Sequence, residues 1–120
     1  MWEGINRRRF PRANYNCVIK VKTKGERPYL IKTHTENIGM GGICVVLRED
    51  VTLFKGVELE ILLQNGNPSV TCDGTVVWVV KRSDPKDKNN IAFDTGIEFI
   101  NIKEFDKKRI GAIVEKILLS

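Results

Sequence analysis

The sequence contains little of the chemistry that enzyme active sites use. Its 120 residues include a single histidine, His34, and none of the motifs of serine hydrolases, zinc proteases or phosphate-binding loops. The acidic residues are scattered and form no evident acid–base pair. These gaps favour a binding module over an enzyme, so no catalytic residue is predicted.

Cysteine and long apolar segments are also scarce. Cys17, Cys44 and Cys72 form no C-x-x-C pair and lie in apolar stretches, so we expect buried, reduced thiols rather than a metal site or disulfides. No apolar run approaches the roughly 20 residues of a membrane helix, and none follows the basic residues at the start. The sequence predicts a cytoplasmic protein with no membrane insertion, no metal and no cofactor.

Positive charge is concentrated near the N-terminus. Residues 1–33 hold nine basic and two acidic residues, a net charge of +7, whereas residues 34–120 carry −2. A localised positive field suits a polyanionic partner such as a nucleic acid, a nucleotide or an acidic surface. The lysines of this stretch are interpreted as solvent-facing strand residues, which leaves Arg7, Arg8, Arg9 and Arg12 as candidates for binding.

Short alternating segments dominate the remaining sequence. Period-two alternation and β-forming residues predict six strands, over 15–23, 29–35, 43–47, 57–63, 69–81 and 91–100. An amphipathic helix is predicted over 103–119, with Asn101 and Glu104 resembling a capping box. Six strands closed by a helix indicate one antiparallel barrel or sandwich domain over 14–120, after a flexible basic arm over 1–13.

Two segments are expected to leave the sheet. Residues 83–90 are polar and contain Pro85, so they are predicted to form a loop. Residues 36–42 hold three glycines in four positions, which predicts a turn whose backbone takes positive φ or comes close to another group. Gly74, inside an expected strand, is predicted to mark a bulge or a bend.

Two features carry binding chemistry. The run of residues 7–12, RRRFPR, offers guanidinium groups, which donate paired hydrogen bonds to phosphate oxygens or to the O6/N7 edge of guanine. In residues 37–42, NIGMGG, the glycines let backbone N–H groups approach a ligand, and the Asn37 amide both donates and accepts. Each feature alone also fits a simpler alternative, a basic tail or a plain β-turn.

Together, and in this order, the two features resemble those of PilZ domains. Arg8 and Arg12 match the R-x-x-x-R element of that family, with Arg7 preceding them, and residues 37–42 match its [D/N]-x-S-x-x-G element. The strands over 74–78 and 95–99 and the closing helix match as well. The resemblance therefore extends from Arg7 to about Leu119.

The resemblance implies a mainly β fold, a six-stranded antiparallel split β-barrel with a C-terminal α-helix, that binds cyclic di-GMP. The residues it assigns to the ligand are Arg7, Arg8, Arg9, Arg12, Asn37, Gly39, Gly42 and Trp78. The arginines would contact guanine and phosphate, and Arg7 would help to hold a second, stacked copy of the ligand. Asn37 and the backbone near the two glycines would receive a guanine edge, whereas Trp78 would either flank the site or belong to the core or the barrel surface.

One position departs from the family pattern, since Gly39 stands where PilZ domains usually have serine. The change removes a hydroxyl hydrogen bond worth about 1 kcal/mol net. We therefore expect weaker binding of cyclic di-GMP rather than none.

Three functions remain open. The first is a cyclic di-GMP receptor whose arm folds over the barrel on binding and presents a changed surface to an unidentified downstream protein. The second, which Gly39 favours, is a PilZ-like protein-interaction module that does not bind the nucleotide. The third is a small basic barrel that binds nucleic acid, which the low aromatic content of 8% disfavours.

Overall fold

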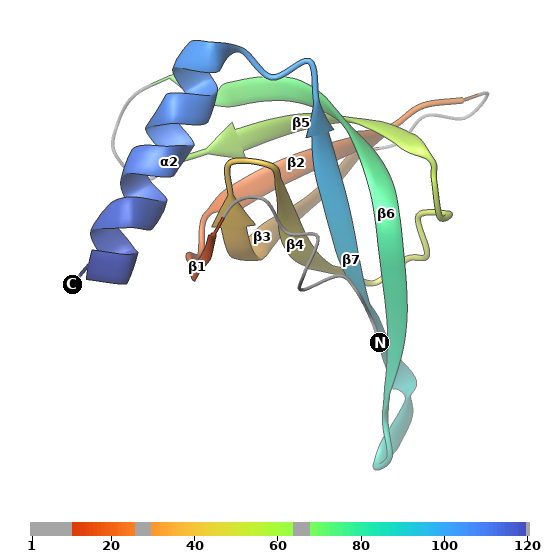
Figure 1. The fold of residues 1–120 in the computed structure, drawn as a ribbon. Coiled ribbons are helices and arrows are strands. Elements are labelled where there is room, and N and C mark those ends of the chain that lie inside the picture. The colour runs from red at the N-terminus through yellow and green to blue at the C-terminus, as the bar shows by residue number, and fades with distance from the viewer. Residues whose placement is uncertain (1–10, 26–29, 64–67, 120) are drawn as a thin grey trace.

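A computed structural model describes residues 11–25, 30–63 and 68–119. Its elements, shown in Figure 1, are β1 (Arg12–Asn14), β2 (Val18–Thr23), β3 (Leu30–Gly39), β4 (Gly42–Leu47), β5 (Gly56–Leu62), β6 (Val70–Asp84), β7 (Asp87–Ile100) and α2 (Glu104–Leu119). All strand pairings among them are antiparallel.

Six of these strands close into a barrel. β3, β2, β5, β6, β7 and β4 are hydrogen-bonded neighbours in that order, and β3 also pairs with β4, which closes the ring. β1 pairs with the C-terminal half of β3, on the edge opposite to β4. The predicted fold class, a six-stranded antiparallel barrel with a C-terminal helix, is confirmed. Arg12 and Ala13, the last residues of the expected arm, belong to β1, and residues 1–10 of that arm lie outside the described residues.

The interior of the barrel is filled by aliphatic side chains at alternate positions of the strands. Fully buried examples are Ile19, Val21, Ile43, Val45, Ile61 and Ile97. Between the buried residues of β2, Lys20 lies 3.6 Å from Glu60 and Lys22 lies 3.9 Å from Glu58, across the pairing with β5. These lysines face solvent and are paired with carboxylates, so they add little to the positive field of the N-terminal region.

The helix α2 packs against β1 and β3 through one face. Ile110 and Val114 on that face are buried, whereas Phe105 is 72% exposed. The predicted span agrees with the structure to within one residue, but the predicted capping box is wrong. Asn101 adopts a left-handed conformation with φ of 59° and turns the chain before the helix begins at Glu104. Within the described part of the chain, no helix is both long and apolar enough to cross a bilayer.

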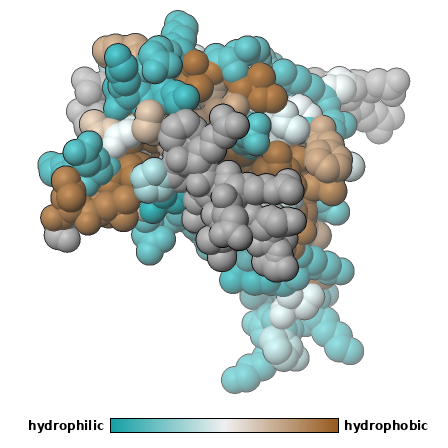
Figure 2. Space-filling model, viewed as in Figure 1, coloured by the Kyte–Doolittle hydropathy of each residue, from teal (hydrophilic) through white to brown (hydrophobic). Residues whose placement is uncertain are grey.

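The predicted loop over 83–90 is wrong, because β6 and β7 continue through it. β6 ends at Asp84 and β7 begins at Asp87, which leaves only Pro85 and Lys86 as the turn of a long hairpin. Figure 1 shows this hairpin extending well past the barrel, and its far end is hydrophilic in Figure 2. Both faces of a projecting hairpin meet water, so its sequence lacks the alternation that indicates a strand.

Candidate functional site

A row of residues crosses the outer face of five neighbouring strands. Asn14 of β1 pairs with Asn37 of β3, which pairs with Cys44 of β4. Cys44 pairs with Gly96 of β7, which in turn pairs with Trp78 of β6. The residues on either side of Cys44 and of Gly96 are buried in the core, so the row points away from it. We call these five residues the cross-strand row.

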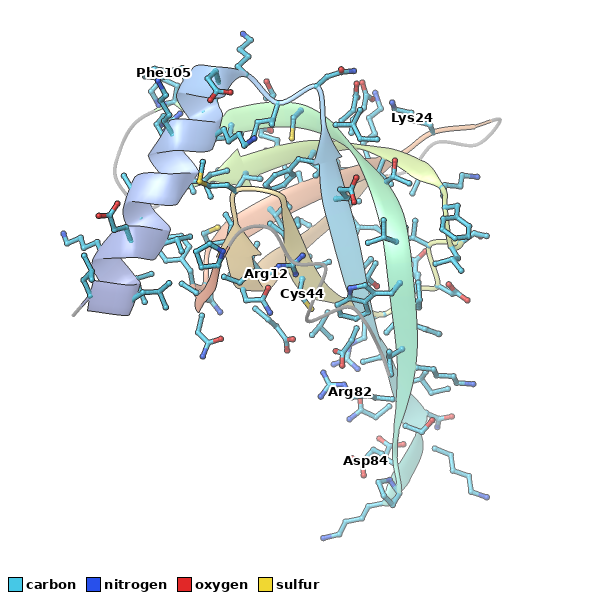
Figure 3. The ribbon with its side chains drawn as sticks, in the orientation of Figure 1. Arg12, Lys24, Cys44, Arg82, Asp84 and Phe105 are labelled. Atoms are coloured by element: carbon cyan, nitrogen blue, oxygen red, sulfur yellow. The ribbon has the colours of Figure 1, made fainter. Side chains whose placement is uncertain are left out.

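Arg12 and Asn37, which come from the two sequence motifs, meet on this row. Nη1 of Arg12 donates a long hydrogen bond of 3.4 Å to Oδ1 of Asn37, although 25 residues separate them in sequence. The contact exists because β1 runs antiparallel to the end of β3 and pairs Arg12 with Gly39. Figure 3 shows Arg12 beside Cys44 on this face of the barrel. The fold thus places a guanidinium and a carboxamide side by side at the surface.

The turn predicted over 36–42 is shorter in the structure, because β3 continues to Gly39 and only Met40 and Gly41 separate it from β4. Its glycines also avoid positive φ, which among the described glycines occurs only at Gly25. The expected close approach is present instead. A Cβ at Gly42 would stand 2.3 Å from the carbonyl oxygen of Ile97, and a Cβ at Gly39 would stand 2.8 Å from that of Pro11. The glycines are required because neighbouring backbones occupy the space of a side chain.

An irregularity in β6 turns the side chain of Trp78 outward, so that it joins the row. The register shifts between Val76 and Trp78, rather than at Gly74, where a bulge or bend was predicted. Two residues after a core position, Trp78 would face inward in a regular strand, but the shift pairs it with outward-facing Gly96. Its indole lies directly on Gly96, since a Cβ there would stand 2.1 Å from Nε1. The missing side chain at Gly96 leaves room for the half-buried indole against β7.

Carboxylates of β3 and β7 border the row. Arg82 of the long hairpin lies 2.8 Å from Asp94 and 3.9 Å from Glu36, so one guanidinium bridges two acidic side chains of different strands. Figure 3 shows Arg82 on the long hairpin, nearer to its far end than Arg12 and Cys44 lie. Arg82 therefore partly neutralises the acidic side chains that an anionic ligand would meet at this border.

The Cys44 thiol lies at the centre of these charges. Its Sγ donates to Oε2 of Glu36 at 3.8 Å. Burial, helped by the carboxylates of Glu36 and Asp94, raises the pKa of the Cys44 thiol to about 11, and the positive charge of Arg12 opposes this only in part. The thiol is thus neutral at physiological pH and acts as a small apolar group beneath the site.

The structure brings together part of the site predicted from the sequence. Arg12, Asn37 and Gly39 meet where β1 pairs with β3, Gly42 begins β4, and Trp78 lies at the far end of the row. The predicted residues Arg7, Arg8 and Arg9 lie outside the described residues. No group of His, Cys, Asp or Glu in the described ranges could hold a metal ion.

Sequence reasoning missed several neighbours of the site, namely Glu36, Cys44, Arg82, Asp94 and Gly96. A signal for two of them was present, because Asp94 and Gly96 alternate with the buried Thr95 and Ile97 and therefore belong on the outer face. No such signal existed for Arg82, which lies in the hairpin whose far end was taken for a loop.

A family profile for the PilZ domain matches residues 6–116. The chain belongs to the PilZ domain family. The family resemblance inferred from the two motifs is thereby confirmed. At the level of sequence, no curated protein matches this chain significantly.

Solved structures share the fold of this PilZ domain. The Bacillus subtilis inhibitor of motility MotI/DgrA matches with a TM-score of 0.73 and 21% identity, over 94% of this chain and 52% of that one. The PilZ domain of Escherichia coli YcgR with c-di-GMP matches with a TM-score of 0.70 and 14% identity, over 94% and 92%. MrkH of K. pneumonia in its apo state matches with 0.73 and 16%, over 94% and 53%. The chain thus spans about half the length of MotI/DgrA and of MrkH.

Proposed function

We propose that this PilZ domain is a receptor for cyclic di-GMP, which binds on the cross-strand row. The ligand is held by Arg12, Asn37 and Trp78, by the backbone near Gly39 and Gly42, and by the arginines at positions 7 to 9. The observation that carries the proposal is the contact between Arg12 and Asn37 at 3.4 Å. It joins the two motifs of the family on one exposed face.

The chemistry of these groups suits a guanine dinucleotide. Guanidinium groups donate in pairs to phosphate oxygens and to the O6/N7 edge of guanine, and the Asn37 amide adds a donor and an acceptor next to Arg12. The indole of Trp78, four strands away from β1 along the row, offers an aromatic surface for a base. Two related structures, the YcgR PilZ domain and MrkH, are complexes with c-di-GMP, which supports this ligand.

Binding is proposed to change the conformation of the protein and to signal to a downstream partner. Met40, in the turn between β3 and β4, packs against the helix, since a Cβ at Gly111 would stand 2.8 Å from its Sδ. Pro11, next to Arg12, borders the same apolar groove as Met40, Val114 and Leu118. A ligand that moves Arg12 or the turn therefore also moves residues that line the groove beside α2.

A PilZ-like interaction module without a ligand is the second candidate, and Gly39 in place of serine is the observation that favours it. A nucleic-acid-binding barrel has less support, because the lysines of β2 are already paired with glutamates. Among the described residues, Trp78 is also the one aromatic side chain of the cross-strand row.

The proposal is tested by titrating the protein with cyclic di-GMP in a calorimeter. The variant Arg8→Ala, Arg12→Ala removes two positive charges at the site, and the control Lys86→Ala, Lys88→Ala removes two charges near the exposed end of the hairpin. We expect saturable binding by the wild type and the control and none by the site variant.

Absence of heat at high micromolar ligand would contradict the proposal and favour the ligand-free module. Equal binding by the two variants would mean that the site is elsewhere. A mobility shift of random RNA or DNA at physiological salt, lost in the Arg8→Ala, Arg12→Ala variant, would favour the nucleic-acid alternative.

A further inference from the structure

Gly39 lies directly beneath the backbone that enters β1. A Cβ built at Gly39 would stand 2.8 Å from the carbonyl oxygen of Pro11 and 3.0 Å from Cγ of Arg12. Real Cβ atoms essentially never approach a backbone atom this closely, and a backbone oxygen cannot turn aside as a side chain can. The entry to β1 therefore occupies the space that any side chain at position 39 would need.

This close approach belongs to an ordered pairing that fixes Arg12. Gly39 is the register partner of Arg12, and the pairing continues through Ala13 with Ile38. Ala13 is only 3% exposed and lies in the hydrophobic core. One residue beyond β1, the amide of Tyr15 donates to the carbonyl of Glu36 at 3.3 Å. The backbone of β1 thus holds Arg12 where its side chain reaches Asn37.

We propose that Gly39 is a positioning residue, whose missing side chain lets β1 lie on β3 and thereby holds Arg12 against Asn37. The inference rests on the proposed function, because this placement of Arg12 matters for binding only if the ligand uses it. It also gives the departure from the family pattern a physical role. In this chain a serine at position 39 would collide with the Pro11 carbonyl before its hydroxyl could serve a ligand.

Two variants and a control test the inference. Gly39→Ala and Gly39→Ser introduce the same Cβ and differ only in the hydroxyl. Gly56→Ser, the control, places the serine side chain at the start of β5, outside the proposed site, where a Cβ would meet nothing nearer than Cδ of Lys24 at 3.9 Å. We expect fluorescently labelled cyclic di-GMP to bind both position-39 variants about tenfold more weakly than the wild type, and the control within about twofold of it.

The same variants are compared by NMR without ligand. In both position-39 variants we expect the signals of residues 12–15 to move and the Tyr15 amide to exchange faster with solvent. Unchanged core signals, for example those of Val45 and Ile97, show that each variant is folded. If Gly39→Ser does not fold, Gly39→Ala, which adds only the methyl group, decides the matter.

A double-mutant cycle shows whether Gly39 acts through Arg12. We expect Gly39→Ala to weaken binding about tenfold in the wild type and less than about twofold in the Arg12→Ala background. Equal losses in the two backgrounds would overturn the inference.

Three other results would overturn it as well. They are binding by Gly39→Ser as tight as that of the wild type or tighter, a loss confined to one of the two variants, and unchanged signals for residues 12–15. If the wild type itself does not bind cyclic di-GMP, the proposed function fails. The ligand-free NMR comparison then still decides whether Gly39 positions β1 and Arg12.

Discussion

Replacing Gly96 with alanine should displace the indole of Trp78. The new Cβ would stand 2.1 Å from Nε1 and 2.2 Å from Cε2, whereas ordinary van der Waals contact begins at 3.4 Å. The ring must therefore move outward by roughly 1.3 Å or more, or β6 and β7 must separate. Overpacking of this kind costs about 1–3 kcal/mol of unfolding free energy. Because the ring leaves the surface of the row, cyclic di-GMP should also bind more weakly.

Urea unfolding and tryptophan fluorescence check this prediction. The sequence has two tryptophans, so a Trp2→Phe background leaves Trp78 as the single indole reporter. In that background Gly96→Ala should shift the emission of Trp78 to the red, because the ring becomes more exposed to water. In a Trp78→Ala background the same substitution should cost less than about 0.5 kcal/mol, since the obstructing ring is gone. Unchanged emission and stability, or an equal cost in both backgrounds, would refute the packing of Trp78 on Gly96.

Three further predictions test the fold and the charges around the site. Gly42→Ala should lower the free energy of unfolding by about 1–3 kcal/mol, because its Cβ would meet the Ile97 carbonyl oxygen at 2.3 Å; a change below about 0.5 kcal/mol in urea unfolding would contradict this. The pKa of the Cys44 thiol is raised from 9.0 to about 11, so its contribution to stability is complete below pH 9 and is lost as the pH rises through 11. Between pH 9 and 11, the free energy of unfolding should therefore fall more steeply for the wild type than for Cys44→Ala. Parallel plots of unfolding free energy against pH for the two proteins would argue against the raised pKa. Ile110→Ala should cost about 2–5 kcal/mol because the side chain is fully buried, whereas Phe105→Ala, at a position 72% exposed, should cost less than about 1 kcal/mol; similar losses would mean that α2 docks by another face.

The barrel was predictable because its strands are half-buried. In β2 the alternation of Ile19 and Val21 with Lys20 and Lys22 reports which face meets the core, and the same reasoning holds for β5. The helix was predictable for a similar reason, since Ile110 and Val114 recur at helical spacing. Only its cap was predicted wrongly, because Asn101 resembles a cap in sequence but turns the chain with a positive φ.

Some of the errors share a physical cause, which is that contacts between distant segments override local preference. The residues around Gly39 predict a turn at that position. In the fold, β1 pairs with one edge of the end of β3 and β4 with the opposite edge, and these pairings keep β3 extended through Gly39. The outward direction of the Trp78 side chain depends on a register shift that nothing in the sequence of β6 indicates. The two motifs themselves were found, whereas the contact between Arg12 and Asn37 became visible only once β1 was paired with β3.

The most direct test of the central claim is a titration of the isotope-labelled protein with unlabelled cyclic di-GMP, followed by NMR. The side-chain amide of Asn37 and the indole N–H of Trp78 report on the two ends of the proposed site. The account predicts saturable shifts of both signals, with little change on the β2–β5 face around Lys22 and Glu58. Absence of shifts at high micromolar ligand, or shifts confined to that other face, would contradict it.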